Sequence, residues 1–340
     1  MQLTCEILTV HTKHPFIIAR GGTSEYRVVW VKVRDADGAE GWGEAAPSKF
    51  YGESAESVMA AVQSFAPLLE NADAWSLEAI EKSLESVLRW NAAARCAVSA
   101  ALHDLQGKRL GVPLWKLWGL DAKAAPQSSF TIGIAPDEET LRARVREASG
   151  YPILKVKLGS TRDAENLRIV RKEAPGAILR VDANAAWNPK LAIQMMDTLV
   201  QCGVEMLEQP VPAHDIAGLK FIRDRSPIPV VADESCLVAT DIPRLAEAVD
   251  GVNIKLAKCG SVREAIRMIA VARAHGLKVM CGCMIETTLG IAAAAHFSPL
   301  LDYADFDGAA LLSDDPFDGP GIPNGLITLG DAPGLGVTRR

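Results

Sequence analysis

The chain has 340 residues, of which 49% are hydrophobic and 23% charged, and its formal net charge is -6. A chain of this length folds into one large or two ordinary domains with a sizeable core. The negative charge and the lack of a Lys/Arg block argue against nucleic-acid binding, and no apolar stretch is long enough to span a bilayer.

Neither a secretory signal nor a disulfide framework is expected. The chain starts Met-Gln-Leu-Thr-Cys-Glu, without a basic segment followed by an apolar run. Its seven cysteines are an odd number and form no C-x-x-C pair. Cys281 and Cys283 lie in an apolar, strand-like run, which favours a core position over a zinc site. We therefore expect a reduced, cytoplasmic protein, and a homo-oligomer remains open.

The first part of the chain is typical of an antiparallel hairpin followed by helices. Residues Val28–Arg34 alternate in polarity, Asp37-Gly38 supplies a turn, and Gly41–Ala45 returns. Helical spacing with polar starts then predicts three helices, over Ser54–Leu69, Ser76–Leu88 and Ala92–Lys108. A softer stretch, Asp121–Ser129, is interpreted as a linker.

The rest of the chain repeats a short apolar run and a helix-length segment eight times. The runs are Phe130–Ile134, Ile153–Lys157, Ile178–Asp182, Val204–Glu208, Pro229–Asp233, Val252–Leu256, Lys278–Gly282 and Tyr303–Asp307. Strands and helices that alternate in this way form a parallel sheet, and eight units predict a closed α/β barrel. An open doubly wound sheet competes, but it would normally carry a Gly-rich phosphate turn, which is absent here.

Five successive predicted strands end in charged residues, in the order Lys, acid, acid, acid, Lys. These residues are Lys157, Asp182, Glu208, Asp233 and Lys255, spaced 25, 26, 25 and 22 residues apart. In a barrel these strand ends surround one site. Converging carboxylates repel one another unless a cation joins them, and an all-oxygen site favours Mg²⁺ or Mn²⁺.

Two details of this pattern follow from strand periodicity. Asp233 is preferred to its neighbour Glu234 as a ligand because it keeps the register of Val231. Lys155 and Lys157 point to the same side of their strand.

The two flanking lysines are candidate acid and base groups. A nearby cation and desolvation lower the pKa of a lysine, and a neutral lysine is a general base near neutral pH. The metal can bind a substrate carboxylate and stabilise the enediolate that forms when the α-proton leaves. Lys157 and Lys255 lie on the second and sixth predicted strands, across the barrel, so we expect them to reach opposite faces of one carbon and invert it.

The motifs that carry these residues resemble the enolase superfamily, in particular its muconate-lactonizing branch, over nearly the whole chain. They are Lys155-Val-Lys157, Val181-Asp182-Ala183-Asn184, Glu208-Gln209-Pro210, Ala232-Asp233-Glu234-Ser235, Asn253-Ile254-Lys255, Gly41-Trp42-Gly43-Glu44 and Leu105-Gln106-Gly107-Lys108. The resemblance implies an N-terminal α+β capping domain (1–122), a modified TIM barrel of (β/α)7β type (123–310), and a C-terminal segment (311–340) that returns to the cap. It also implies that Asp182, Glu208 and Asp233 hold magnesium and that Lys157 and Lys255 are the acid/base pair.

Within that branch the chain most resembles the dipeptide epimerases that act on L-Ala-D/L-Glu, which implies a place in murein-peptide metabolism. Asp305 and Asp307 match an Asp-x-Asp that holds the α-ammonium of the dipeptide. The stretch Pro15–Arg20 resembles a lid loop whose arginine, here Arg20, meets the glutamate carboxylate. Thr131 and Lys155 complete the expected substrate contacts. One departure is Lys258-Cys259-Gly260-Ser261, where relatives usually have two glycines.

Other functions stay open at this point. N-acylamino-acid racemase, o-succinylbenzoate synthase and muconate cycloisomerase share the metal and the lysines, but their substrates lack the free ammonium that Asp305 and Asp307 would bind. A Schiff-base aldolase would use Lys157 covalently and has no need of three carboxylates. A binding protein without catalysis is disfavoured, because charges in a desolvated site are costly. No histidine ends the seventh strand, which disfavours the mandelate-racemase branch.

Overall fold

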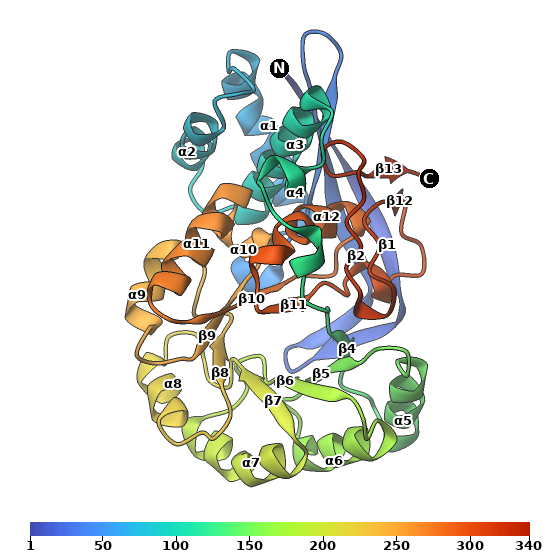
Figure 1. Ribbon diagram of the computed structural model, residues 1–340, viewed down its shortest axis with the longest axis vertical. Coiled ribbons are helices and arrows are strands. Elements are labelled where there is room, and N and C mark those ends of the chain that lie inside the picture. Colours follow the sequence, from blue (N-terminus) through green and yellow to red (C-terminus); the bar gives the residue numbers. More distant parts are fainter.

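The computed structural model describes residues 1–340 and has two parts (Figure 1). A three-stranded antiparallel sheet with helices lies at one end, and a ring of parallel strands surrounded by helices lies at the other. Both termini lie at the end that holds the antiparallel sheet (Figure 1).

The antiparallel sheet has the order β1 (Gln2–Ile18), β2 (Gly21–Arg34), β3 (Glu40–Ala45). The predicted hairpin is confirmed by the pairing of β2 with β3. Strand β1 was not predicted. It pairs with β2 along almost its full length, with a register shift between His11 and Phe16. The resulting long hairpin reaches from the cap to the ring of strands (Figure 1).

Three helices cover this sheet: α1 (Ala55–Glu70), α2 (Leu77–Val87) and α3 (Ala92–Leu110). They confirm the three predicted helices to within two residues at each end. Ser54 caps α1 through a reciprocal pair of hydrogen bonds with Ser57. Helix α3 lies very close to β3, since an added Cβ at Gly41 would be 1.9 Å from the carbonyl oxygen of Ala101. The glycines of the Gly-Trp-Gly-Glu motif therefore allow helix and sheet to touch.

The barrel contains all eight predicted parallel strands. They are β4 (Phe130–Ile132), β5 (Ile153–Lys157), β6 (Ile178–Asp182), β7 (Val204–Glu208), β8 (Val230–Ala232), β9 (Gly251–Ile254), β10 (Lys278–Gly282) and β11 (Tyr303–Asp305). Neighbours in sequence are neighbours in the sheet. A bridge between Ser128 and Ala304 closes the ring from β11 to the chain just before β4. Several strands are shorter than predicted, so Asp233, Lys255 and Asp307 lie just beyond strand ends.

Helices follow the first seven barrel strands. They are α5 (Glu138–Glu147), α6 (Asp163–Glu173), α7 (Pro189–Gln201), α8 (Ile216–Arg223), α9 (Ile242–Leu245), α10 (Leu256–Cys259), α11 (Val262–Ala274) and α12 (Thr288–Phe297). The eighth strand is followed directly by the short η5 (Ala309–Leu311) and by no α-helix. This arrangement confirms the (β/α)7β barrel with an N-terminal α+β cap.

Short elements complete the chain, namely α4 (Leu114–Leu117), η1 (Lys49–Tyr51), η2 (Ala122–Ala124), η3 (Ala239–Asp241), η4 (Ser298–Leu300), η6 (Pro323–Gly325), β12 (Phe317–Asp318) and β13 (Thr338–Arg339). The last residues pack on the cap, where the Leu335 amide donates to Asp104 on α3 at 2.8 Å. The domain boundaries at residues 122 and 310 stay a prediction.

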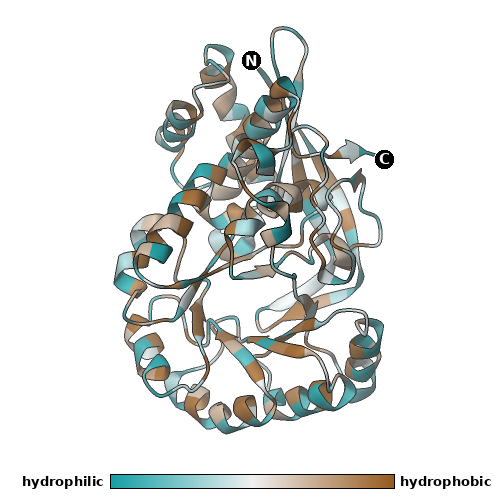
Figure 2. Cartoon of the chain, in the orientation of Figure 1, coloured by the Kyte–Doolittle hydropathy of each residue, from teal (hydrophilic) through white to brown (hydrophobic).

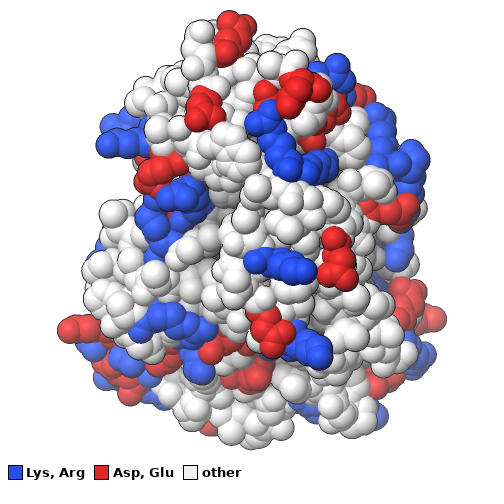
Figure 3. All heavy atoms as spheres, turned by 45° about the horizontal axis from the view of Figure 1, so that its top comes forward, with Lys and Arg blue, Asp and Glu red and all other residues white.

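The interior divides into two large apolar clusters. One joins the barrel strands to their surrounding helices, and the other lies between the antiparallel sheet and α1–α3. Figure 2 shows apolar residues on the inner sides of the outer helices and polar residues outside. Positive and negative side chains are interspersed on the face in Figure 3. Every helix is too short or too polar to cross a lipid bilayer.

Candidate active site

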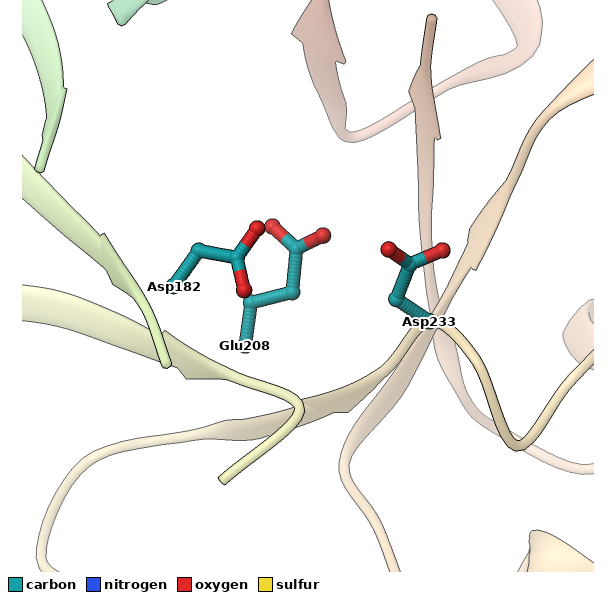
Figure 4. A group of neighbouring side chains, drawn as sticks. All are labelled: Asp182, Glu208 and Asp233. Carbon is teal, nitrogen blue, oxygen red and sulfur yellow. The ribbon is translucent and has the colours of Figure 1, made fainter. Parts of the chain in front are cut away.

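Three carboxylates converge at the C-terminal ends of neighbouring barrel strands (Figure 4). Asp182 ends β6, Glu208 ends β7, and Asp233 follows β8. One oxygen of each lies within 4.8 Å of one oxygen of the others. All three side chains are buried. The alternation of strand residues predicts this convergence, because each acid faces the barrel interior.

The buried charges shift the pKa values of these acids in different directions. Burial raises the pKa of Asp182, but Lys157 and Lys155 outweigh it and lower the pKa to about 2. Burial, reinforced by Asp182, raises the pKa of Glu208 to about 7. Burial is likewise outweighed at Asp233, where Lys255 and Lys258 hold the pKa well below its usual range. The carboxylates thus depend on nearby positive charge to stay ionised.

Lysines surround the carboxylates on both sides of the ring. Lys157 Nζ lies 2.7 Å from Asp182 Oδ2, and Lys255 Nζ lies 2.9 Å from Asp233 Oδ2. Strand β5, which carries Lys157, is separated from β9, which precedes Lys255, by three strands in either direction around the ring. The two ammonium groups therefore approach the site from opposite sides.

Lys155 occupies the centre between three acids. Its Nζ lies 2.7 Å from both Glu208 and Asp305 and 3.4 Å from Asp182. Burial disfavours its charge, but Asp305 and Glu208 outweigh burial and raise its pKa. Burial is also outweighed at Lys255, where Asp233 raises the pKa. The pKa of these lysines is predicted to fall when a cation binds the carboxylates, and that stays a prediction.

The carboxylate triplet fits a hard divalent metal. Glu208 is fully buried, and its Oε2 accepts no hydrogen bond of good geometry although Lys155 Nζ lies 2.7 Å away. Mg²⁺ and Mn²⁺ bind groups of oxygen ligands. A buried carboxylate oxygen without a hydrogen bond is free to be one of them.

Two further residues hold the carboxylates and were not identified from sequence as site residues. Asn253 Nδ2 donates to Glu208 Oε1 at 2.7 Å. Lys258 Nζ donates to Asp233 Oδ1 at 2.6 Å and to the carbonyl oxygens of Asp233, Cys236 and Asn253. The sequence offered a signal, because Lys258 lies one helical turn after Lys255.

A second acidic pair lies beside the metal-ligand candidates. Asp305 accepts hydrogen bonds from Lys155 and from Ser129, each at 2.7 Å. Asp307 accepts from the Thr131 amide at 2.5 Å. Burial, followed by repulsion from Asp305, raises the pKa of Asp307 to about 7. An additional cationic group would relieve this repulsion.

A cavity of about 450 Å³ opens onto these groups, within the size range of small-ligand sites. The barrel contributes Lys155, Lys157 and Lys255 to its lining, and no histidine lines it. Thr131, Asp305 and Asp307 form part of the wall. The cap contributes Arg20 and Phe50, among others, so the cavity lies between the two parts of the molecule.

Arg20 lies at the tip of the β1–β2 hairpin. The expected lid loop is largely strand, because Phe16–Ile18 pair with Gly21–Thr23 up to the turn. The Ile134 amide donates to the carbonyl oxygen of Ile17 at 2.8 Å and fixes the tip to the chain after β4. The hairpin thus places Arg20 at the barrel mouth.

Comparison with known proteins finds the same architecture over the full chain. Residues 2–119 match the mandelate racemase / muconate lactonizing enzyme N-terminal domain, and residues 138–340 match the enolase C-terminal domain-like family. The chain is 40% identical to an L-Ala-D/L-Glu epimerase of Bacteroides thetaiotaomicron, over 100% of this chain and 88% of that one. It is 38% identical to an L-Ala-D/L-amino acid epimerase of Maribacter sp., over 99% of each.

A solved structure shows the same similarity in three dimensions. A dipeptide epimerase from Enterococcus faecalis, complexed with Mg and the dipeptide L-Leu-L-Tyr, superposes with a TM-score of 0.94. It is 30% identical, and the match covers 99% of each chain.

Proposed function

Because the chain belongs to the mandelate racemase / muconate lactonizing enzyme family of the enolase superfamily, we propose that it is a magnesium-dependent dipeptide epimerase. It inverts the α-carbon of the second residue in dipeptides of the L-Ala-D/L-Glu type. The arrangement of Lys157 and Lys255 on opposite sides of a buried carboxylate triplet carries this proposal.

Asp182, Glu208 and Asp233 are the residues that would hold the ion. When bound, Mg²⁺ would neutralise the substrate carboxylate and stabilise the negative charge that develops on it during proton removal. Mn²⁺ takes the same oxygen donors, so we include it as a substitute.

Lys157 and Lys255 move the proton. One lysine removes the α-proton from one face of the carbon, and the other delivers a proton to the opposite face. The roles exchange when the other epimer is the substrate. This two-base exchange inverts the carbon without any covalent bond to the protein.

Asp305 and Asp307 bind the α-ammonium of the dipeptide. Both are buried, and both line the cavity beside Lys157. Thr131 holds Asp307 through its amide, and Lys155 joins Asp305 to the metal-ligand candidates. Arg20 contacts the side chain of the second residue from the cap. A substrate with a free amine satisfies the acidic pair, whereas an acylated amine would leave it unpaired.

Proton exchange in heavy water tests the proposal. In ²H₂O with Mg²⁺, the NMR signal of the α-proton of the glutamate residue in L-Ala-L-Glu should disappear, and the L-Ala-D-Glu epimer should form. Exhaustive chelation should stop both processes, and added Mg²⁺ should restore them. Equal turnover of the N-acetylated dipeptide would instead support an acylamino-acid racemase.

We also propose that the enzyme works in the cytoplasm on peptides released from the cell wall. All seven cysteines are free, which suits a reducing compartment. The labelled products of murein digestion, incubated with the enzyme, should include epimerised L-Ala-D-Glu.

A further inference from the structure

Arg20 is already engaged on three sides. Its Nη1 donates to the carbonyl oxygen of Asn184 at 2.7 Å, and its Nη2 lies 2.8 Å from Oε1 of Glu234. Its guanidinium carbon lies 4.2 Å from the centroid of the Phe50 ring. One third of the side chain, 33%, remains exposed. Arg20 therefore has fixed partners and still faces the cavity.

Glu234 is a buried carboxylate whose oxygens accept no hydrogen bond. Its side chain is 1% exposed, and Arg20 is its ion-pair partner. Neither carboxylate oxygen accepts a hydrogen bond of good geometry, so the N–H group of Arg20 does not point at the oxygen 2.8 Å away. Burying a carboxylate without hydrogen bonds is costly. Burial raises the pKa of Glu234, and the charges of Lys255 and Arg20 oppose this, Arg20 through the one ion pair that Glu234 forms.

A substrate carboxylate at Arg20 must compete with these contacts. Guanidinium groups bind carboxylates best through two parallel N–H groups. Here Asn184 already takes Nη1, and Glu234 lies against Nη2. An acidic second residue would use the N–H groups that Asn184 leaves free, and its charge would compete with that of Glu234 for the same guanidinium. A neutral second residue would leave the Arg20–Glu234 pair intact and would meet the Arg20 stem and the ring of Phe50, which both line the cavity.

We propose that Glu234 determines substrate specificity at the second residue. It neutralises Arg20 in the resting site, which admits neutral and apolar second residues and weakens the preference for an acidic one. This inference rests on the proposed dipeptide-epimerase function. It assigns Glu234 a contact with Arg20 and no part in proton transfer.

The test compares kcat/KM for L-Ala-L-Glu and L-Ala-L-Val in the wild type and in variants. In Glu234→Gln, Arg20 loses its charged partner, and the Glu/Val ratio should rise about tenfold, the scale of one charge-assisted hydrogen bond. In Arg20→Met the ratio should fall about tenfold for the same reason. Glu81→Gln is the matched control, because Glu81 is a buried carboxylate that bonds Ser99 outside the cavity. Its ratio should equal that of the wild type.

A second variant covers the case in which Glu234→Gln does not fold. Glu234→Asp keeps the charge but withdraws it from Arg20 by one methylene, and its ratio should rise by a smaller factor. A wild-type ratio in the folded Glu234 variants overturns the inference while the epimerase function stands. If the wild type epimerises neither dipeptide, the proposed function fails and this inference fails with it.

Discussion

The two lysines should act on opposite faces of the α-carbon and therefore on different epimers. We expect Lys157→Ala and Lys255→Ala each to abolish epimerisation, because inversion needs a proton donor on the face opposite the base. Each variant should still exchange the α-proton of one epimer with solvent through the lysine that remains. NMR in ²H₂O with each pure epimer measures this exchange. A single-lysine variant that still epimerises at the wild-type rate would show that one base serves both faces.

Lys258 should affect metal affinity without touching the substrate. Its ammonium directs Asp233 through a 2.6 Å hydrogen bond and ties that residue to the backbone of Cys236 and Asn253. Mutation of a residue that hydrogen-bonds a metal ligand typically lowers metal affinity about 10–100-fold. We expect Lys258→Met to raise the Mn²⁺ dissociation constant by such a factor.

Titration of Mn²⁺ followed by electron paramagnetic resonance checks this prediction. Lys220→Met is the control, because Lys220 forms an exposed pair with Asp224 at 3.3 Å. Unchanged Mn²⁺ affinity in a folded Lys258→Met protein would limit Lys258 to a structural role.

Some site residues were predictable from sequence and others were not. Asp182, Glu208 and Asp233 stand out because strand periodicity and an even spacing bring them to one edge. Asn253 lies two residues before Lys255 and therefore faces the same side of its strand, so strand periodicity places it at the site, although its bond to Glu208 needed the structure. The pairing of Arg20 with Glu234 joins residues far apart in the chain, and nothing local in either segment indicates it.

At the scale of single elements, the contact between α3 and β3 depends on glycine. An added methyl group at Gly41 would lie 1.9 Å from the Ala101 carbonyl oxygen and 2.8 Å from the Leu105 side chain. We expect Gly41→Ala to lower the free energy of unfolding by about 1–3 kcal/mol or more, since a packed backbone has to move. Urea unfolding measures the change.

Gly176→Ala provides the control for this prediction. An added Cβ at Gly176 meets no atom within 4 Å, so the free energy of unfolding should stay within about 0.5 kcal/mol of the wild type. Similar losses in both variants would mean that the close approach of α3 and β3 does not limit stability.

The elements differ in how far their sequences predict them. The barrel strands are recognisable because each is a short, mainly apolar and mainly buried run, but the predicted runs extend up to two residues beyond the strand ends. Asp233, Lys255 and Asp307 continue the alternation beyond the last residue of their strands, whereas Lys157, Asp182 and Glu208 belong to the ladder. The outer half of β1 is exposed around Lys13 and His14, where it extends along the barrel mouth. The polar residues there interrupt the apolar alternation by which a strand is recognised in sequence.

At the scale of the whole molecule, the regular repeat in the sequence predicts the barrel. Only the structure shows which residues of the cap contact it. Glu44 on β3 accepts the Thr287 amide at the start of α12 at 2.9 Å. Burial raises the pKa of Glu44 to about 8. A raised carboxyl pKa stabilises the fold most below the unfolded value of 4.5, and this contribution is lost as the pH rises through 8.

A buried histidine at the other side of this junction has the opposite effect. His296 on α12 lies 3.1 Å from the Leu335 carbonyl oxygen and 3.3 Å from the Trp115 amide, which donates to its Nδ1. Burial lowers its pKa from 6.5 to about 4. A lowered histidine pKa gives stability that is present above pH 6.5 and is lost as the pH falls through 4. The contact between the C-terminal segment and the barrel should therefore be sensitive to acid.

We expect His296→Gln to lose less stability on acidification than the wild type. Glutamine can keep both hydrogen bonds and cannot be protonated in this range, whereas charging the buried imidazole costs on the order of 2 kcal/mol by pH 4.5. Urea unfolding at pH 7.5 and pH 4.5, with chelator present so that metal binding adds no pH dependence, gives the loss for each protein. Carboxylates with raised pKa, such as Glu44, act equally in both proteins and cancel in the comparison. Equal losses in the two proteins would mean that His296 is protonated as readily in the folded chain as in the unfolded one.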